Sequence, residues 1–285
     1  MIGDVVGDPG LEVLGSKLPS IIKEYSADFV IVNGENAAGG FGLTAPHLEK
    51  IFAAGADVVT GGNHIWEKRE FLPVLDSDER VLRPLNYPSG SPDQKTAGRG
   101  WLKLEKPSHD GAITWLVVNL QGREFMTALD CPFKAYDNFE AGQGGDALGM
   151  AAILTPDGKL LPGLLEKPII LVDFHAESSR EKEALAYYLD GRADVVAGTH
   201  THVQTADERI LPKGTAYITD LGMTGVIDGI IGMDPKICID RARNQVLYRM
   251  EVAASDGEGK TAIQGIIVEI DIKSRKAVSI KRLNL

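Results

Sequence analysis

Two histidines two residues apart follow a strand-like segment in the last third of the chain. Residues 194–197 run directly into Gly198-Thr199-His200-Thr201-His202. At this spacing in an extended segment both imidazole rings point the same way, and imidazole is a common metal ligand. Loops at the carboxyl ends of parallel strands are where α/β proteins place their sites. The pair therefore predicts metal ligands beside a buried strand.

Four more segments repeat this arrangement of an apolar strand followed by ligand-type side chains. They are Gly3-Asp4 after Ile2, Gly34-Glu35-Asn36 after residues 29–33, Gly61-Gly62-Asn63-His64 after residues 58–60, and His175 after residues 169–174. A single cluster of this kind is a weak signal. Five in one chain indicate a site for two metal ions.

Each of these side chains also has an ordinary structural explanation, but together these explanations require five coincidences at strand ends. They are a turn at Asp4, loop capping by Glu35 and Asn36, a turn at Asn63-His64, and a satisfied core histidine at His175. The His200 and His202 pair is harder to explain in this way.

The candidate ligands combine carboxylates, amides and imidazoles. This mixture suits Fe, Mn, Zn or Co better than Ca or Mg, which prefer all-oxygen shells. A carboxylate can bridge two cations, and two ions roughly 3.5–4 Å apart can clamp a phosphoryl group and share an activated hydroxide. The candidates are Asp4, Glu35, Asn36, Asn63, His175, His200 and His202.

The remaining histidines and the glycine runs lack this context. His47 lies at a predicted helix start and His109 in a predicted surface turn, so neither receives a role. The runs at 39–40 and 142–145 fit neither phosphate-loop pattern between a strand and a helix.

The elements that would position the clusters alternate between strand and helix in the first half of the chain. The predicted helices cover residues 11–22, 44–52 and 67–75, and the predicted strands cover 29–32 and 57–60. Such alternation favours parallel strands joined by crossover helices. Thr44 is a candidate N-cap for the second helix, with Pro46 in its first turn.

Beyond Pro84 the pattern indicates antiparallel pairing followed by further strands. Strands are expected at 101–104, 113–120, 169–174, 216–219, 246–252, 263–272 and 277–283. Ser178-Ser179-Arg180-Glu181 is a capping box that opens a helix reaching Tyr188, and residues 273–276 read as a hairpin turn. One α/β domain spanning residues 1–285, with two mixed sheets and helices outside, accounts for the whole pattern.

Composition limits the class of protein. The chain has 285 residues, a net charge of −10, and 44% hydrophobic residues. It is long enough for a sizeable core, and its acidity argues against a broad surface for duplex nucleic acid. No apolar run approaches the roughly 20 residues of a membrane span. We therefore expect a cytoplasmic protein without membrane contact, in which Cys131 and Cys238 are free thiols.

The order of the motifs GD, GEN, GNH, FH and GTHTH resembles that of the calcineurin-like metallophosphoesterases, whose usual blocks are DxH, GDxxD, GNH, H and GHxH. Longer stretches look like the YmdB-like branch of that superfamily. They are GDVVGDPG, VNGENAAGGFGLT, GGNHIWEKRE, RPLNYP, VNLQGREFM, DFHAESSREKEALAYYLDGRA and GTHTHVQTADERILPKGTAYITDLGMTG, and they run from residue 3 to residue 225.

The resemblance implies a four-layer α/β/β/α sandwich, a two-metal centre of iron or manganese, with zinc or cobalt as further options, and phosphodiesterase activity on cyclic nucleotides. Carried onto this chain, it places Asp4, Asn36 and His202 on the first metal, and Asn63, His175 and His200 on the second. Glu35 would bridge the two ions, and His64 would sit beside the substrate phosphate without binding metal.

Two features distinguish the chain within this pattern. Val6 and Glu35 replace the histidine and aspartate of the wider superfamily, and the YmdB-like branch shares both changes. Relatives usually carry a few more residues before the first aspartate than the three that precede Asp4 here, so we expect a short first strand. Residues 139–160 are longer than the corresponding family loop and read as an inserted hairpin on a glycine-rich stem.

Together with the observations above, the resemblance implies a phosphodiesterase that hydrolyses 2′,3′- and/or 3′,5′-cyclic nucleotides by in-line attack of a metal-bridging hydroxide, with His64 protonating the leaving oxygen. A phosphomonoesterase or nucleotidase on the same centre is one alternative, and a regulatory nucleotide-binding protein with little turnover is another. The expected partner is a small phosphodiester. The apolar residues of the 139–160 hairpin need a surface to rest on. We expect that surface to be a neighbouring subunit, which makes the protein a homo-oligomer; the parent sheet, with the hairpin as a lid over the metal site, is the alternative.

Overall fold

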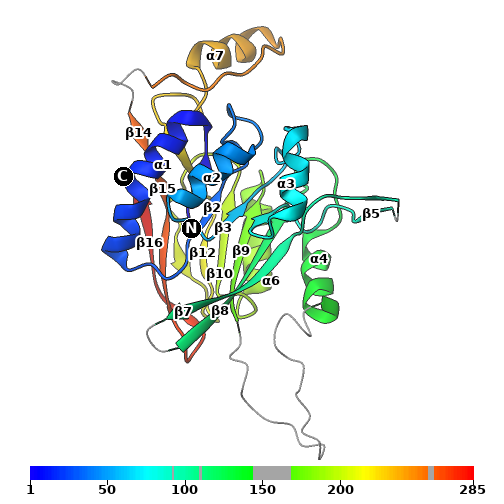
Figure 1. The fold of residues 1–285 in the computed structure, drawn as a ribbon, viewed down its shortest axis with the longest axis vertical. Helices are drawn as coiled ribbons and strands as arrows, with labels where there is room; N and C mark the ends of the chain where they lie inside the picture. The colour runs from blue at the N-terminus through cyan, green and yellow to red at the C-terminus, as the bar shows by residue number, and fades with distance from the viewer. Residues whose placement is uncertain (92, 109–110, 144–167, 256–259) are drawn as a thin grey trace, which may run out of the picture.

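The computed structural model describes residues 1–91, 93–108, 111–143, 168–255 and 260–285, which form a mixed α/β fold (Figure 1). The larger sheet consists of β7 Trp101–Ser108, β8 Gly111–Gln121, β9 Ile169–His175, β10 Val195–Thr199, β11 Arg209–Ile210 and β12 Ala216–Ile218. Its strand order is β11-β12-β10-β9-β8-β7, with parallel inner strands and an antiparallel strand at each edge. Thr199, His175 and Gln121 are register partners across it, so β10, β9 and β8 end side by side.

A second set of strands lies next to the N-terminus. Its members are β2 Ile31–Asn33, β3 Val58–Thr60, β4 Val81–Leu82, β15 Gln264–Asp271 and β16 Lys276–Asn284. Strands β2, β3 and β4 are parallel, whereas β15 and β16 form an antiparallel hairpin. Ile2 bridges Val32 on one side and Gly265 on the other, which joins the two groups.

The first strand is short, as expected, and continues directly from Ile2. This strand, β1 Asp4–Val5, pairs in parallel with β13 Met223–Val226, which pairs in turn with β14 Thr261–Ala262. Because Ile2 pairs with β2, Asp4 emerges beside the carboxyl end of that strand.

Helices cover the strands through three main apolar clusters. The helices are α1 Gly7–Tyr25, α2 Ala45–Ala53, α3 Leu72–Ser77, α4 Pro132–Asn138, α6 Ser179–Leu189 and α7 Pro235–Asn244; a 3₁₀ turn spans Arg69–Phe71, a π turn Phe139–Gln143, and β5 Gly90–Ser91 pairs with β6 Gln94–Lys95. The first cluster joins α1 and α2 to β2 and β3, the second joins β2 and β3 to the larger sheet, and the third joins the larger sheet to α6. Burial of this apolar surface is the main favourable term in folding.

Several predicted elements are confirmed with small changes of boundary. Ser178 caps α6 by accepting a hydrogen bond from the Glu181 N–H at 3.2 Å, and residues 272–275, one residue earlier than predicted, join β15 to β16. Cys131 and Cys238 are free. The helix expected at 67–75 instead begins as the 3₁₀ turn at Arg69 and extends to Ser77. Thr44 stands at the N-cap of α2, but its hydroxyl contacts His47 rather than a backbone N–H.

The strand predicted at 246–252 is wrong. Its apolar residues alternate as in a strand, yet only Val252 pairs, through an isolated bridge to Met233. Residues 242–249 are exposed, and Gln245 ends α7 in a left-handed conformation. Helices α4 and α7 were not predicted. The inserted hairpin expected at 139–160 lies largely outside the described residues, and residues 139–143 form the π turn.

Among the described residues, no helix combines the length and the apolar character needed to cross a bilayer.

Candidate metal centre

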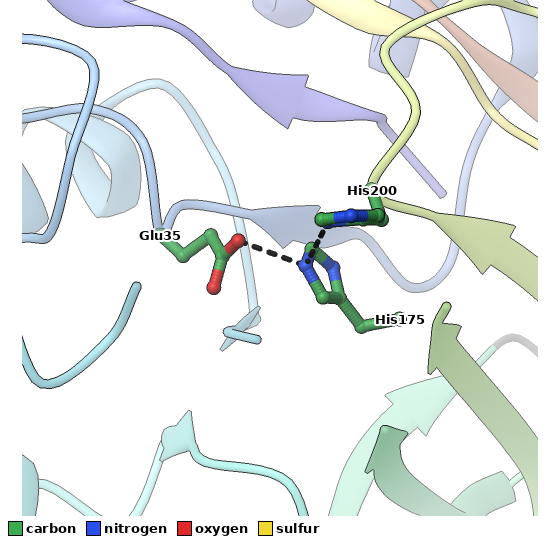
Figure 2. A group of neighbouring side chains, drawn as sticks. All are labelled: Glu35, His175 and His200. Atoms are coloured by element: carbon green, nitrogen blue, oxygen red, sulfur yellow. Dashed lines mark hydrogen bonds and ion pairs between the residues drawn. The ribbon is translucent and has the colours of Figure 1, made fainter. Parts of the chain in front are cut away.

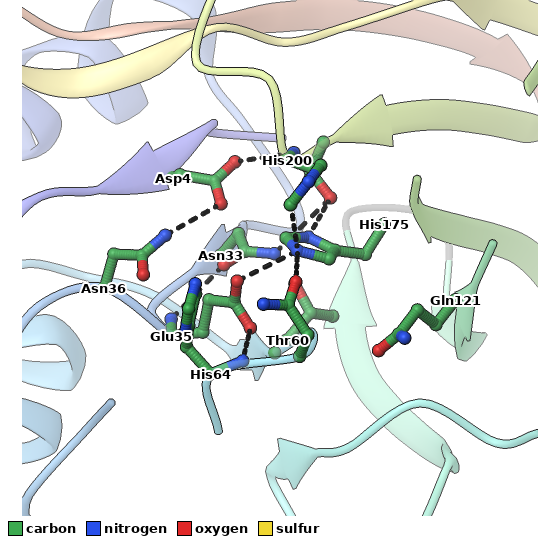
Figure 3. A network of polar contacts seen from close by, with 12 residues as sticks. Asp4, Asn33, Glu35, Asn36, Thr60, His64, Gln121, His175 and His200 are labelled. Atoms are coloured by element: carbon green, nitrogen blue, oxygen red, sulfur yellow. Dashed lines mark hydrogen bonds and ion pairs between the residues drawn. The ribbon is translucent and has the colours of Figure 1, made fainter. Parts of the chain in front are cut away.

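The predicted side chains come together at β1 and at the carboxyl ends of β2, β3, β9 and β10 (Figure 3). Asp4 is the first residue of β1, His175 is the last residue of β9, and the other side chains lie in the loops that follow β2, β3 and β10. The structure therefore gathers all of the predicted ligands and the predicted acid in one region, which consists of Asp4, Glu35, Asn36, Asn63, His64, His175, His200 and His202. His47 lies apart, 3.6 Å from Asp8, and His109 lies outside the described residues.

The tightest group surrounds one nitrogen of His175. Its Nε2 lies 2.9 Å from Glu35 Oε1, 3.1 Å from Asn63 Oδ1 and 3.0 Å from His200 Nδ1 (Figures 2 and 3). Glu35 and His175 are fully buried. Glu35, His175 and His200 each offer a ligand atom within 4.8 Å of the others.

Hydrogen bonds on the far side of each imidazole show which atoms face this centre with lone pairs. Thr199 donates its hydroxyl proton to Asp173 at 2.7 Å, so its oxygen accepts from Nδ1 of His175 at 3.0 Å. Because the ring proton of neutral His175 is on Nδ1, its Nε2 carries a lone pair. Likewise, the Glu177 carboxylate lies 3.2 Å from Nε2 of His200. The ring proton of His200 is therefore on Nε2, and its Nδ1 carries a lone pair.

Burial keeps both imidazoles neutral. It lowers the pKa of His175 to about 4 and that of His200 to about 3. Burial also raises the pKa of Glu35 to about 7. A proton on Glu35 would satisfy one contact of His175 but leave the lone pairs of Asn63 and His200 facing each other. A cation can accept lone pairs from all four ligand atoms, so the residues present fit a bound metal ion. These atoms are Glu35 Oε1, Asn63 Oδ1, His175 Nε2 and His200 Nδ1.

A second group lies beside the first. His202 donates from Nδ1 to the Ile231 carbonyl at 2.9 Å, so its Nε2 lone pair faces Asn36 Nδ2 at 3.1 Å and Asp4 Oδ1 at 3.7 Å. Asn36 Nδ2 also donates to Asp4 at 3.4 Å, while its Oδ1 is buried with no partner among the described residues. Rotating the amide by half a turn would aim that oxygen at the same point as Asp4 and His202, giving three ligand atoms.

The loop that carries His200 and His202 is held by a buried ion pair that was not predicted. Both histidines have positive φ, 103° and 64°, which costs free energy for residues other than glycine. Between them, Thr201 donates its N–H and its hydroxyl to Asp220 at 3.1 and 2.8 Å. Lys182 of α6 donates to the same carboxylate at 2.7 Å, with both side chains about 1% exposed.

Lys182→Met should therefore lower the free energy of unfolding by about 3–5 kcal/mol, because it leaves the Asp220 carboxylate buried without its counter-charge. Urea denaturation measures this change. Arg99→Met is the matched control: its 3.1 Å pair with Glu79 is exposed, and it should cost less than about 1 kcal/mol. Equal effects of the two substitutions would contradict the role given to Lys182.

Asp173 is a further buried residue that the sequence analysis did not assign. Its carboxylate accepts from Thr60, from Thr199 at 2.7 Å and from Asn33 at 3.2 Å, and Thr199 contacts His175. This series of hydrogen bonds, from Asp173 through Thr199 to His175, fixes the tautomer and the ring orientation of His175, as outer partners of metal ligands commonly do. Asp173 stands two residues before His175 on β9, on the same face of the strand, and that spacing is the signal that could have identified it.

His64 borders the centre without joining the ligand contacts. Its backbone N–H donates to Glu35 Oε2 at 3.0 Å, and Glu67 Oε1 lies 3.4 Å from Nδ1. The ring meets Phe41 edge-on at 5.0 Å. Within the described residues Nε2 has no hydrogen-bond partner, so it is available to a bound molecule.

The centre opens into a cleft of about 700 Å³. The side chains on one wall are ligand-type, and the other wall comes largely from α7 and the segments that flank it. Lining residues are Asn36, Gly40, Phe41, His64, Glu177, His200, Thr201, His202, Ile231, Met233, Cys238, Arg241, Ala242 and Met250. The cleft volume lies within the usual range for small-molecule sites.

A bound cation should stabilise the fold, because it binds the native state and not the unfolded chain. At a concentration 100 times Kd, each site should add about 2.7 kcal/mol. Differential scanning fluorimetry of metal-stripped protein should show Tm rising when Mn²⁺ or Fe²⁺ is added. His47→Ala should respond like the unmodified protein and His200→Ala should not. An unchanged Tm in the unmodified protein would contradict metal binding at this centre.

Comparisons with known proteins identify relatives along nearly the whole chain. A family model described as YmdB-like protein matches residues 1–283. A Bacillus subtilis protein named 2′,3′-cyclic-nucleotide 2′-phosphodiesterase is 43% identical over 282 residues, covering 99% of this chain and 94% of that protein.

Two solved structures are similar along the whole chain. A hypothetical protein from Thermus thermophilus has a TM-score of 0.82 and 37% identity, with 100% of this chain and 97% of the other covered. A structure described as a novel phosphatase from Mycoplasma pneumoniae has a TM-score of 0.83 and 30% identity, with 100% and 91% covered.

Proposed function

The chain belongs to the YmdB-like family and is a phosphoric diester hydrolase, and we propose that it opens 2′,3′-cyclic nucleotides with the help of two metal ions. The observation that carries the metal part is the meeting of four lone-pair atoms at His175 Nε2, beside a second group around Asp4. The 2′,3′ choice rests on the name of the Bacillus relative.

Glu35, Asn63, His175 and His200 would hold one cation, and Asp4, Asn36 and His202 the other, with Glu35 reaching both. Iron or manganese suits this mixture of oxygen and nitrogen donors. When bound, the two cations neutralise charge on the phosphoryl oxygens and lower the pKa of the attacking water.

The chain's own residues complete the reaction. The water oxygen forms a bond to phosphorus while the bond from phosphorus to the 2′ oxygen breaks, giving a 3′-phosphate and a free 2′ hydroxyl. His64 donates a proton from Nε2 to the leaving 2′ oxygen and regains one from solvent, which receives the proton that the water loses. Glu67 at Nδ1 and Phe41 at the ring edge orient the imidazole for this transfer.

The layered fold, the cellular location and the oligomeric state belong to the same proposal. The apolar clusters would separate the layers of a four-layer α/β/β/α sandwich formed by one domain over residues 1–285. The protein would work in the cytoplasm. It would form a homo-oligomer.

The test is to incubate protein loaded with Mn²⁺ or Fe²⁺ with adenosine 2′,3′-cyclic phosphate, the 3′,5′-cyclic isomer and adenosine 3′-phosphate, and to follow the products by ³¹P NMR. We expect adenosine 3′-phosphate from the 2′,3′ isomer and no turnover of that product. Faster hydrolysis of the monoester would identify a phosphomonoesterase. Binding without turnover would identify a regulatory nucleotide-binding protein.

A further inference from the structure

The wall of the cleft opposite the ligand-type side chains carries a cation without an acidic partner. Among the described residues that line the cleft, Arg241 of α7 is the only lysine or arginine. Its guanidinium makes one hydrogen bond, to the Tyr248 carbonyl at 3.2 Å, and no ion pair within the described part of the chain. Most of its five N–H donors therefore remain available, in the planar fork that matches a phosphate.

The acidic groups nearby leave this charge uncompensated. Glu177 also lines the cleft, but its carboxylate contacts His200 at 3.2 Å. Asp234 accepts the capping hydrogen bond of α7, from the Ile237 N–H at 2.9 Å. Asp240 is half-buried on the same helix and makes no ion pair among the described residues. In a chain of net charge −10, a free arginine beside an anion-binding site indicates a contact with an anion.

The strap 235–250, which comprises α7 and the residues after it, carries further positive charge outside the cleft. Lys236, Arg243 and Arg249 are exposed and form no ion pairs among the described residues, and Tyr248 is 41% exposed. In Figure 1 the strap lies beyond the same end of the sheet to which the carboxyl ends of the strands point. Exposed cations and an exposed aromatic ring on one short segment are typical of surfaces that bind single-stranded nucleic acid.

The remaining side chains that line the Arg241 side of the cleft are largely apolar. Phe41, Met233 and Met250 line it, and they provide soft, adaptable contacts for a flat ring without fixing a pattern of hydrogen bonds. A nucleotide base can rest there while the reacting phosphate lies at the ligand side chains. A ribonucleotide that carries a 2′,3′-cyclic phosphate has one further oxygen that commonly bears phosphate, the 5′ oxygen.

We propose that Arg241 binds a phosphate on the 5′ oxygen of the substrate, so that the preferred substrate is the 2′,3′-cyclic end of a short RNA strand rather than a free cyclic nucleoside monophosphate. The inference rests on the proposed function. It also places the enzyme after a reaction in which RNA is cut by attack of its own 2′ hydroxyl, because that reaction leaves 2′,3′-cyclic ends.

The test compares kcat/KM for adenosine 2′,3′-cyclic phosphate, the same compound with a 5′-phosphate, and the dinucleotide ApA ending in a 2′,3′-cyclic phosphate. We expect the two larger substrates to be preferred by about tenfold, as one charge-assisted hydrogen bond supports. Arg241→Met should remove this preference, so that kcat/KM for the two larger substrates falls to about the value for the smallest. Arg243→Met, on α7 but outside the cleft, should keep it. Added salt should shrink the preference wherever Arg241 is present and should have no such effect in Arg241→Met.

Binding of products gives an independent readout. Calorimetry should show adenosine 3′,5′-bisphosphate binding about tenfold more tightly than adenosine 3′-phosphate, with the difference lost in Arg241→Met. Equal kcat/KM for all three substrates in the unmodified protein would overturn the inference while leaving the proposed function intact. So would an equal loss on all three in Arg241→Met, which would place Arg241 on the reacting phosphate. No turnover of any cyclic phosphate would overturn both proposals.

Discussion

Replacing Glu35 with glutamine is expected to remove bound metal and to abolish hydrolysis of the cyclic phosphate. Glu35 is fully buried, and one of its carboxylate oxygens lies 2.9 Å from Nε2 of His175. Outer partners of metal ligands typically contribute about 10–100-fold to metal affinity, and a carboxylate that touches the ions themselves should contribute more than about 100-fold. Metal analysis by plasma mass spectrometry and kcat from the same preparation measure both effects.

The control for this substitution is Glu49→Gln on α2, which removes an equally charged but exposed carboxylate away from the site. It should keep close to two ions per chain and full activity. If Glu35→Gln retained both ions and turned over at the normal rate, Glu35 would not bridge the ions. Loss of one ion with the other retained would place Glu35 on a single metal.

The position of the ligands could be predicted because the carboxyl ends of parallel strands meet at one edge. Asn36 and His200 follow β2 and β10, His175 ends β9, and this rule alone brings the three together. The spacing of His200 and His202 correctly indicated two neighbouring candidate ligands, but the extended backbone from which we inferred it is absent. Both residues have positive φ rather than extended backbone, so it is the loop, and not a strand alternation, that aims the two rings.

The supports of the site could not be predicted because each depends on a long-range contact. Lys182 and Asp220 are separated by 38 residues, and a lysine on a helix usually faces solvent. Asp173 accepts a hydrogen bond from Asn33 across 140 residues. Only the assembled sheets show that these side chains meet, although the spacing of Asp173 from His175 gave a partial signal.

For a different reason, α7 was not predicted and the segment after it was wrongly predicted as a strand. Helix α7 is short and has no buried residue, so it does not pack into the core, and the clearest signals in its sequence were the N-cap Asp234 and Pro235 at its start. After it, Val246, Tyr248 and Met250 alternate like a strand. Met250 faces the cleft, whereas Val246 and Tyr248 are exposed. Alternation therefore reflected a wall of a binding site and not a buried sheet.

Replacing His64 with alanine should separate chemistry from metal binding. His64 contacts the ligand group only through its backbone N–H, which alanine retains, so both ions should stay bound. Loss of the imidazole that protonates the leaving oxygen should lower kcat by about 10²–10⁴-fold. Metal content, Tm in Mn²⁺ and kcat of one preparation measure these effects together.

Two comparison variants make this result interpretable. His47→Ala removes an imidazole that contacts Thr44 and Asp8 and should change neither metal content nor kcat. His200→Ala removes a nitrogen 3.0 Å from His175 Nε2 and should lose metal and activity together. If His64→Ala emptied a metal position, His64 would be a ligand and the general acid would have to be sought elsewhere. A substrate whose leaving group needs no proton, such as a p-nitrophenyl phosphodiester, should be hydrolysed by His64→Ala with a much smaller loss, because the leaving phenolate is stable without protonation.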